Sequence, residues 1–526
     1  MKRILCTILL ILLSTSLVPL SSAATFVVGS QITSNNTQAS ADPSLMYYHE
    51  NNTVWAFYNI QGQNGNFDIF YRILNPNCLQ SACLLIFYPQ HRLTSGPGNS
   101  QFESATETAD GTVWVFFGSD RTGSLGIYYK TFDGVAWSVD SQFTTWNGLD
   151  THPSALATSD GNLWVAWASS LTCLPGCIGN IAVRIFNGTA WSPIQNVTSY
   201  GQDFEPSLSQ ATDGTVWLVW ARTTGSKGQH DIFYTTLDTS GNPDPPIQLS
   251  TDASDDSWPT VVGVANSPVI AVVFASNRNM VFDQGANRNL PEYDLFMKYS
   301  LNSGATWSAD SQIYQNPTTN PPRVVDNTEP MALQYSQGRI GIVWKSDLTG
   351  ATNIFSMSIM MADVGITGWS SLQTVVAQGK TVKFNVTLAN HGWEPELVSL
   401  TLTANGTQVG NPVQVNVPYQ GTGLASLVWN TTGFARGKYV LTATEGSLVG
   451  ESNSTNNTLS ATVTVTIPGD VNGDRTVNIL DLVAVAIGFN SRAGGPSYNP
   501  NIDVNQDGVV NILDLTYVAT RFGNTG

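Results

Sequence analysis

The chain has 526 residues, of which 11% are charged, and its 38 acidic and 22 basic side chains give a net charge of −16. A chain of this length exceeds the roughly 100–200 residues of one ordinary domain, so we expect several domains. The acidic balance argues against nucleic-acid binding, because proteins that bind nucleic acids carry basic patches that contact phosphates.

The first residues predict a secretory signal peptide over residues 1–23. Met1-Lys2-Arg3 precedes an apolar run from Ile4 to about Leu20, and small residues follow at 21–24, which is the order found in exported proteins. The run is shorter than the ~20 apolar residues of a spanning helix, and an uncleaved anchor is the alternative. No later segment is apolar enough to span a bilayer, so we expect a secreted, extracellular or cell-surface protein without a membrane span after cleavage.

Four cysteines beyond this signal form two close pairs, Cys78 with Cys83 and Cys173 with Cys177. No neighbouring histidine completes a zinc site, so two local disulfides in an oxidising compartment are favoured, and free thiols are the alternative. Asn-x-Ser/Thr sequons would make the chain a glycoprotein in a host that glycosylates exported proteins. They include Asn187, Asn196, Asn385, Asn405, Asn430 and Asn456.

Residues 25–361 contain six copies of one repeat. The clearest copies are an Asp-Gly turn followed by a strand of alternating aromatic and β-branched residues, at 110–117, 160–167 and 213–220. Weaker copies lie at 52–58, 269–274 and 339–344. Each unit also has a first strand that usually begins near a proline, a third strand and a fourth strand. Four antiparallel strands that recur every about 50–70 residues are typical of propeller blades, whose apolar faces are buried only by stacking in a ring.

The sixth unit ends near Met361 without a fourth strand. Residues 25–33 match the fourth-strand pattern and have no unit of their own. We therefore predict that this segment completes the last blade and closes a six-bladed β-propeller, which removes the exposed edge of an open array.

The turn Ser300-Leu-Asn302-Ser-Gly304-Ala-Thr306-Trp307 resembles the Asp-box of the sialidase and BNR-repeat superfamily, with Asn302 in place of aspartate. Degenerate copies occur at 133–137 and 187–191. In that superfamily the box braces a turn and is not catalytic. The resemblance therefore implies a sialidase-like propeller and leaves its activity open.

One face of the ring should collect the starts of the first strands and the ends of the second strands, and propellers usually bind ligands there. The candidates from strand starts are Asp42, Glu103, His152, Glu205 and Glu329, and those from strand ends are Asp120, Arg121, Arg222, Arg278 and Lys345. Carboxylates with shifted pKa values could hydrolyse a glycosidic bond. The alternative is that these charges are solvated or structural.

A sialidase would also need an arginine triad, a Tyr–Glu nucleophile pair and an early Phe-Arg-Ile-Pro motif. The chain has no such motif, and its arginines have no triad pattern, so the resemblance stops short of the catalytic set. Trp146, Trp258 and Trp369 are candidates for stacking on sugars, although tryptophan is also a common core residue of these repeats.

Residues 363–467 change to a Thr- and Val-rich alternation, at 380–390, 397–402 and 459–465. Short strands with polar turns predict an immunoglobulin-like β-sandwich. With Asn390-His391-Gly392 and residues 451–457, the segment resembles the CARDB family of extracellular adhesion-type modules. A plain spacer is the alternative to a ligand-binding role.

Two segments near the C-terminus have the spacing of calcium-binding loops. Calcium prefers six to eight oxygen ligands, which a twelve-residue loop supplies at positions 1, 3, 5, 7, 9 and 12, the seventh through its backbone carbonyl. These positions are Asp470, Asn472, Asp474, Thr476, Asn478 and Asp481 in the first loop, and Asp503, Asn505, Asp507, Val509, Asn511 and Asp514 in the second.

An apolar stretch with helical periodicity follows each loop, at 480–487 and 513–518. The residues expected to pack against the other repeat are Leu482, Val485 and Ala486 in the first stretch, and Leu515, Tyr517 and Val518 in the second.

These loop–helix repeats resemble a type I dockerin over residues 468–526. The resemblance implies two Ca²⁺ sites and a cohesin module as the partner. It places partner recognition at loop positions 10 and 11, which are Ile479, Leu480, Ile512 and Leu513, where many bacterial dockerins have hydroxyl residues. Position 6 of the first loop is Arg475 instead of glycine, so this loop is expected to bind calcium more weakly or to bend differently.

The predicted fold is mainly β: a six-bladed β-propeller, an immunoglobulin-like β-sandwich and a small α-helical dockerin. Two functions fit this order of domains. The first is a secreted, non-catalytic protein that presents the propeller on a cohesin-bearing surface or complex, for recognition of a carbohydrate or a protein. The alternative is a glycoside hydrolase in an extracellular polysaccharide-degrading assembly, because dockerins most often tether such enzymes.

Overall fold

The computed structural model describes most of the chain, and every structural statement below concerns these residues. They are 31–33, 39–63, 65–79, 88–145, 148–170, 179–199, 201–225, 229–316, 319, 321–336, 338–392, 395–419, 421–448, 451 and 453–526. The predicted signal peptide, Trp146, Cys83, Cys173 and Cys177 lie outside them. Cys78 is buried in the 3₁₀ helix η1 (Pro76–Leu79) and is disulfide-bonded, but the two cysteine pairings stay predictions.

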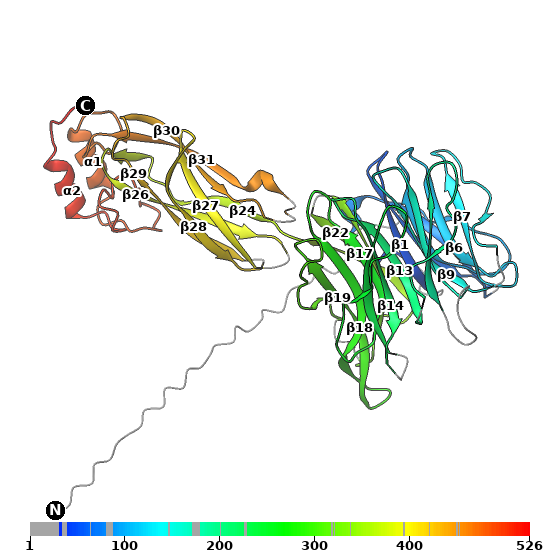
Figure 1. Cartoon of the computed structure of the whole chain (residues 1–526). Helices are drawn as coiled ribbons and strands as arrows, with labels where there is room; N and C mark the ends of the chain where they lie inside the picture. Colours follow the sequence, from blue (N-terminus) through cyan, green and yellow to red (C-terminus); the bar gives the residue numbers. More distant parts are fainter. Residues whose placement is uncertain are drawn as a thin grey trace, which may run out of the picture.

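The N-terminal part is the predicted propeller, built from antiparallel sheets that lie side by side (Figure 1). The first two sheets contain β1 (Ser40–Tyr48), β2 (Thr53–Gln61), β3 (Phe67–Leu74) and β4 (His91–Arg92), then β5 (Ser100–Glu107), β6 (Val113–Ser119), β7 (Gly126–Phe132) and β8 (Ser141–Gln142). The next two contain β9 (Asp150–Ala157), β10 (Leu163–Ser169), β11 (Asn180–Phe186) and β12 (Gln195–Asn196), then β13 (Asp203–Gln210), β14 (Val216–Thr223), β15 (His230–Leu237) and β16 (Ile247–Gln248). The last two contain β17 (Asp256–Gly263), β18 (Ile270–Asp283), β19 (Arg288–Ser300) and β20 (Ser311–Tyr314), then β21 (Asn327–Ser336), β22 (Arg339–Ser346) and β23 (Asn353–Met360).

The blades form a closed ring around their first strands. Strands β1, β5, β9, β13, β17 and β21 contact one another in this order, and β21 also contacts β1. The second strands are the repeated aromatic strands of the sequence, and their side chains fill the space between blades. Trp164, Trp167, Trp220 and Trp344 are fully buried there.

The described end of the N-terminal segment completes the last sheet. Gln31 pairs with Phe355 in an antiparallel bridge, and Ile32 N–H donates to the carbonyl of Ile354. Thr33 Oγ1 then accepts the N–H of Ile354 at 3.0 Å. Other blades repeat this last contact between their own third and fourth strands, as where Ile181 N–H donates to Thr198 Oγ1. The N-terminal segment therefore occupies the place of a fourth strand.

The Asp-box turn joins neighbouring blades. Asn302 Oδ1 accepts the N–H of Thr306 at 2.9 Å, which fixes the turn. Trp307 then packs against Trp217 and donates its indole N–H to Tyr234 Oη at 3.3 Å in the preceding blade. A Cβ on Gly304 would lie 2.2 Å from the Trp217 ring, so glycine is required there. The box braces the fold, as the resemblance implies.

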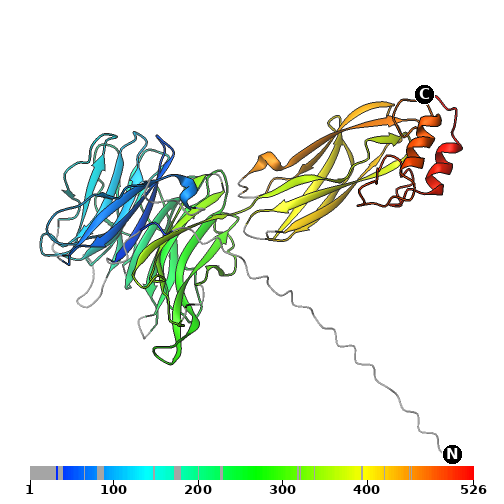
Figure 2. The ribbon, with the colours of Figure 1, turned by 180° about the vertical axis from the view of Figure 1, so that it is seen from behind.

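The C-terminal part is the predicted β-sandwich followed by two short helices (Figure 2). One sheet contains β24 (Val364–Ser371), β26 (Thr381–Asn390) and β29 (Thr422–Asn430). The other contains β25 (Val375–Ala377), β31 (Thr458–Thr466), β30 (Gly437–Glu445), β27 (Glu396–Ala404) and β28 (Thr407–Val417). The 3₁₀ helix η3 (Ser454–Asn456) precedes β31, and α1 (Ile479–Ile487) and α2 (Ile512–Ala519) close the chain. No helix of the described chain has the length and apolarity to cross a membrane.

The two helical repeats pack against each other and against the sandwich. Val485 and Val518 form their shared core, with Leu482 and Leu515 beside them. Two details of the predicted packing are wrong. Ala486 is exposed, and Ala484 takes its place. Tyr517 lies under the guanidinium of Arg521 and near Lys380 of the sandwich, because the sandwich covers that side of α2.

We expect the Thr33→Val substitution to lower the free energy of unfolding of the propeller by about 1–3 kcal/mol, because it leaves two buried groups without their hydrogen bonds. These groups are the Ile354 N–H and the Asn353 Oδ1, to which Thr33 donates at 3.0 Å. Denaturant unfolding followed by tryptophan fluorescence measures the change. Thr367→Val, which removes an exposed hydroxyl of the sandwich, is the control, and equal stabilities of the two variants would contradict the prediction.

Candidate functional site

Each blade begins with a backbone bulge that turns one residue toward the ring axis. The register between the first and second strands shifts there in every blade. The bulge residues have left-handed φ angles between 48° and 58°, and they are Asp42, Phe102, His152, Glu205, Trp258 and Glu329. Non-glycine residues at positive φ are uncommon, and they persist where surrounding contacts stabilise them, often at ligand sites.

These six residues line one pocket at the centre of the ring, with a volume of about 80 Å³. In five blades a proline follows the bulge residue, and Pro43, Pro153, Pro206, Pro259 and Pro330 all reach the pocket. In the second blade this position is Glu103. The pocket therefore combines four carboxyl groups with aromatic walls from Phe102 and Trp258.

Glu103 is the most deeply buried of these acids, with 4% of its surface exposed. Neither of its carboxyl oxygens has a hydrogen-bond partner. Burial, and next the nearby Asp42 carboxylate, raise the pKa of Glu103 well above its usual range. Both effects favour the neutral, protonated form of the Glu103 carboxyl group.

The other three acids accept hydrogen bonds from the bulge of the next blade. Glu329 Oε2 accepts the N–H of Asp42 at 2.8 Å, and Glu205 Oε2 accepts the N–H of Trp258 at 2.8 Å. Asp42 Oδ2 accepts the N–H of Phe102 at 3.3 Å. These carboxylates hold the ring together as well as lining the pocket.

The environment separates the protonation states of these groups. Burial raises the pKa of Glu205 to about 7. Burial also raises the pKa of Asp42, but Lys345 and the amide of Asn59, whose Nδ2 lies 2.5 Å from Asp42 Oδ2, oppose the shift. Lys345 itself forms an ion pair with Glu329. Asn59 and Lys345 thus favour the charged form of Asp42 against burial, whereas Glu103 accepts no hydrogen bond and the Asp42 carboxylate raises its pKa further.

Histidines and a tyrosine lie close to the pocket. His230 Nδ1 lies 2.9 Å from Asp255 Oδ1, and Tyr293 donates its hydroxyl to the other oxygen of Asp255. The hydrogen bond with Asp255 raises the pKa of His230. The Tyr293 ring packs edge-on against Trp258 with centroids 5.5 Å apart. Within the pocket, burial lowers the pKa of His152 to about 4, so its imidazole is neutral.

Asp42, Glu103, Glu205 and Glu329 are the predicted candidates that the structure brings together in the pocket, with His152. Trp258 also lines it, whereas Trp369 packs against the sandwich core. Asp120, Arg121, Arg222 and Arg278 do not line this pocket, and their part in a ligand site stays a prediction. Lys345 lies beside it through its pair with Glu329.

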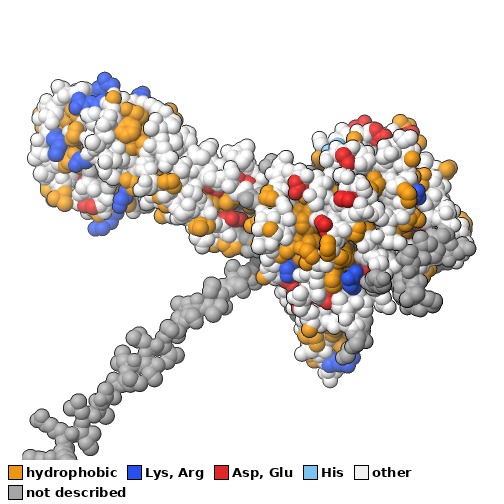
Figure 3. Space-filling model, viewed as in Figure 1, with side chains coloured by type: hydrophobic (Ala, Val, Ile, Leu, Met, Phe, Trp, Pro, Cys, Tyr) orange, Lys and Arg blue, Asp and Glu red, His pale blue; other side chains and the backbone are white. Residues whose placement is uncertain are grey.

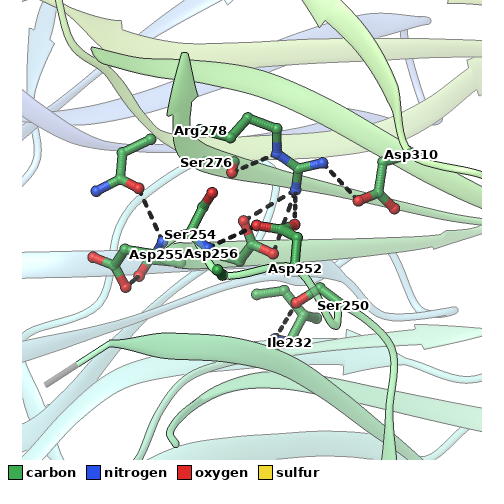
Figure 4. Close-up of polar contacts among 12 residues, drawn as sticks. Ile232, Ser250, Asp252, Ser254, Asp255, Asp256, Ser276, Arg278 and Asp310 are labelled. Atoms are coloured by element: carbon green, nitrogen blue, oxygen red, sulfur yellow. Dashed lines mark hydrogen bonds and ion pairs between the residues drawn. The ribbon is translucent and has the colours of Figure 1, made fainter. Parts of the chain in front are cut away.

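The three arginines instead brace their own blades. Arg222 forms two hydrogen bonds with Asp203, at 2.6 and 3.0 Å, and its guanidinium lies 4.7 Å from the Phe233 ring centre. Arg278 pairs with Asp252, Asp256 and Asp310 (Figure 4) and lies over Phe296.

Arg121 pairs with Asp140 and lies over Tyr128. Asp120 accepts the N–H of Asn99 at 2.6 Å. These four side chains are held by partners in the fold, which agrees with the structural alternative for them.

Sequence reasoning missed Phe102, Asn59, His230, Asp255 and Tyr293. Phe102 was detectable, because aligning the repeats puts it at the position of Asp42 and His152. It was overlooked because the second blade lacks the proline that marks this position elsewhere. The other four lie far apart in the sequence, and their contacts with Asp42 or with one another form only when the blades are in place.

The two predicted calcium loops have matching hydrogen bonds. Asp481 accepts the N–H groups of Val471 at 2.9 Å and Asn478 at 2.9 Å. Asp514 accepts the equivalent groups of Val504 and Asn511, also at 2.9 Å. In this way the last acidic residue of each loop fixes both the loop and the start of the helix after it.

The donor set of the loops fits calcium. Asp470, Asp481, Asp503 and Asp514 are all buried, and all the predicted ligands are oxygens. Asp503 Oδ2 accepts the N–H of Gly508 at 2.9 Å, whereas its buried Oδ1 has no hydrogen-bond partner. A bound cation would satisfy this oxygen.

The predicted partner-binding residues form an exposed apolar surface. Ile479, Leu480, Ile512 and Leu513 lie in the first turns of α1 and α2 and are 59–61% exposed. Exposed Val483 and Ile487 extend this surface along α1, whereas the equivalent residues of α2 are Thr516 and Thr520. The two helices therefore offer unequal surfaces to a partner.

Comparison with known proteins supports the C-terminal assignment directly. Residues 468–523 match the family model of the dockerin type I domain. Dockerin type I domains bind calcium and cohesin modules. A search of curated proteins finds no match to the chain.

The chain is similar to several solved structures. The Hadza microbial sialidase Hz136 has a TM-score of 0.42 and 13% identity, and the match covers 61% of this chain and 66% of the sialidase. The α-L-arabinofuranosidase ARB93A from Fusarium graminearum has a TM-score of 0.44 and 11% identity, covering 64% and 96%. The CARDB domain of a Pyrococcus furiosus protein, solved with di-metal ions, has a TM-score of 0.18 and 22% identity, covering 20% and 90%. Because these TM-scores are all below 0.5, the description of the fold rests on the strand topology given above. The CARDB resemblance stays a prediction.

The pocket predicts an unusual titration. We expect the carboxyl group of Glu205 to titrate near pH 7, because burial disfavours its charged form. A pKa raised on folding adds stability that is full below the unfolded pKa, about 4.3 for glutamate, and is lost as the pH rises toward 7. Carboxyl ¹³C NMR should show an inflection near pH 7 that Glu205→Gln removes and Glu50→Gln keeps. An inflection below pH 5 would contradict the prediction.

Proposed function

We propose that the propeller is a glycoside hydrolase, tethered through its dockerin domain to a cohesin-bearing extracellular assembly. The observation that carries the proposal is the contrast between Glu103 and Asp42 in one pocket. Two carboxyl groups whose surroundings push their protonation states apart are the usual acid and base of glycosidic hydrolysis. Burial without hydrogen bonds favours the protonated form of Glu103, while Asn59, the Phe102 N–H and Lys345 favour charge on Asp42.

In this proposal the two acids divide the reaction between them. Glu103 donates its proton to the leaving glycosidic oxygen. Asp42 then stabilises the positive charge that develops on the sugar, either by direct attack or by activating a water molecule. Phe102 and Trp258 provide apolar faces for the sugar ring, and neutral His152 offers a hydrogen-bonding group without added charge.

A second candidate function is glycan recognition without catalysis. It is favoured by the hydrogen bonds that Asp42, Glu205 and Glu329 accept from the bulges of neighbouring blades. Carboxylates engaged in this way hold the ring, and the pocket would then bind a sugar through its aromatic walls. The two candidates differ in whether the bound sugar is cleaved.

We expect Glu103→Gln to lower kcat by about 10²–10⁴-fold with little change in glycan binding, because it removes the proton donor and keeps the shape of the side chain. A panel of 4-nitrophenyl glycosides and polysaccharides identifies the substrate, and calorimetry measures binding. Glu107→Gln is the control, since Glu107 lies on the same strand and pairs with His49 instead. Full activity in Glu103→Gln would contradict the assignment, and wild-type binding without cleavage of any glycan would favour recognition.

The dockerin domain is proposed to hold two calcium ions. Their ligands would be Asp470, Asn472, Asp474, Thr476, Asn478 and Asp481 in one loop, and Asp503, Asn505, Asp507, Val509, Asn511 and Asp514 in the other. The exposed residues Ile479, Leu480, Ile512 and Leu513 would contact the cohesin. Calcium orders the start of both helices and so prepares this surface.

We expect Leu480→Ser combined with Leu513→Ser to weaken calcium-dependent cohesin capture by at least about tenfold, because each removes an apolar anchor. Both side chains are about 60% exposed, so folding should be unaffected. Binding to a panel of immobilised cohesin modules, with and without EDTA, measures the effect. Phe522→Ser, an exposed apolar residue after α2, is the control. Equal loss in the control, or none in the double variant, would contradict the proposed surface.

A further inference from the structure

Glu445 is a buried acid with no partner, at the end of the sandwich that adjoins the propeller. It is the last residue of β30, and only 3% of its surface is exposed. Neither carboxyl oxygen has a hydrogen-bond partner. A carboxyl group without partners costs several kcal/mol to bury, so its retention calls for a specific reason.

The surroundings of Glu445 are rich in oxygen atoms. The carboxyl groups of Glu451, Asp363 and Glu396 are close enough to act on its charge. The Glu445 N–H donates to the carbonyl of Asn457 at 2.8 Å, which holds the two residues together. The side-chain Oδ1 atoms of Asn456 and Asn457 are also buried without hydrogen-bond partners.

Hydrogen bonds tie these residues into one cluster. Asn457 Nδ2 lies 2.9 Å from both carboxyl oxygens of Glu451. Asn456 Nδ2 donates to Asp363 Oδ1 at 3.1 Å. Ala362, next to Asp363, pairs with Glu451 in a parallel bridge. Residues from the propeller linker and from the connection between β30 and β31 therefore meet at one place.

Protonation alone does not explain this arrangement. Burial, and next the charge of Glu451, raise the pKa of Glu445 to about 8, so the isolated site holds a neutral carboxylic acid at pH 7. A neutral acid still has an O–H and a carbonyl that need partners, and the two amide oxygens remain unpartnered as well. A cation among these oxygens would satisfy all of them together.

We propose that this cluster is a cation site, with Glu445, Glu451, Asp363, Asn456 and Asn457 as its oxygen ligands. Carboxylate and amide oxygens are the donors that Ca²⁺ prefers. Among the described residues no three acidic, histidine or cysteine side chains already converge as a chelating group. In this proposal the two amide oxygens therefore supply part of the ligand set.

The location gives the site a mechanical role. Asp363 lies between the last propeller strand, β23, and the first sandwich strand, β24. Acidic side chains gather at the waist between the two parts in Figure 3, with no Lys or Arg beside them in that view. An ion held by Asp363 and Glu445 would fasten the linker to the sandwich and fix the direction in which the propeller is presented. This inference is independent of the propeller's proposed catalysis.

The test separates this site from the dockerin loops. In a full-length chain that carries Asp481→Asn and Asp514→Asn, we expect calorimetric titration with CaCl₂ to show one remaining calcium ion per chain. Adding Glu445→Gln should abolish that binding. Glu292→Gln, a propeller acid that is equally buried but accepts the Val325 N–H, should leave it unchanged. No calcium bound by the first variant, or one ion still bound after Glu445→Gln, would overturn the proposal.

Thermal unfolding provides a second readout with a change of sign. In EDTA, Glu445→Leu should raise the Tm of the sandwich, because it replaces an unpartnered buried carboxyl group with an apolar side chain. In saturating CaCl₂ the same substitution should lower the Tm relative to the parent chain. The same sign in both buffers would mean a purely structural role and would overturn the proposal. Asn456→Ala, expected to weaken calcium binding at least tenfold, keeps the test decisive if Glu445→Gln fails to fold.

Discussion

The propeller depends on one repeated constraint, the left-handed bulge that opens every blade. At each bulge a non-glycine residue adopts a φ near 50°, a conformation of order 1–3 kcal/mol above the ordinary one. The strain is met by contacts across the ring, since in three places the acid of one bulge accepts the N–H of the next. The proline that follows five bulges has no N–H to satisfy, which suits a position where the strand ladder is interrupted. The second blade alone has Glu103 there, and this exception gives the pocket its deepest acid.

The same bulges explain why structure and chemistry are difficult to separate in this pocket. A carboxylate that accepts a bulge N–H with one oxygen still presents the other to the pocket, as the bonds of Asp42 and Glu205 through a single oxygen illustrate. Ring geometry also forces several acids into one small volume, where burial and mutual repulsion raise their pKa values. Lys345 is the positive charge beside these acids. The Asp42 and Glu205 carboxylates raise its pKa, but burial has the larger effect and lowers it. Acids with shifted pKa values in a cleft are typical of functional sites. Among the acids of this pocket, Glu103 is the one whose carboxyl oxygens accept no hydrogen bond that holds the ring together.

The sequence predicted what depends on local patterns and missed what depends on register. Asp-Gly turns and aromatic strands revealed the propeller, and the missing fourth strand revealed the role of residues 31–33. The pairing of the arginines within their blades was not apparent, because Arg222 lies opposite Asp203 only in the observed register of β13 and β14. Likewise, helical periodicity placed Tyr517 in the dockerin core, but it carries no information about the sandwich, which approaches that side of α2. His230 and Tyr293 are separated by 63 positions in the chain (293 − 230 = 63), so no local pattern could bring them together.

In the two predicted calcium loops, the backbone conformation depends on more than one position. Arg475 at position 6 of the first loop adopts a φ of 71°, where the second loop has Gly508 at 86°, and taken alone this predicts a weaker first loop. Each loop, however, has a second left-handed residue at position 4, which is Gly473 in the first loop and Gln506 in the second. Each loop thus carries one glycine and one non-glycine at its two left-handed positions, so the backbone cost is similar in both. The contacts with the sandwich differ, because the Gln506 amide donates to Gln373 of the sandwich at 2.8 Å, whereas Thr466 of the sandwich donates to Asp470, the first predicted ligand. The sandwich therefore contacts the two loops at different points, so their surroundings are unequal although their backbone costs are similar.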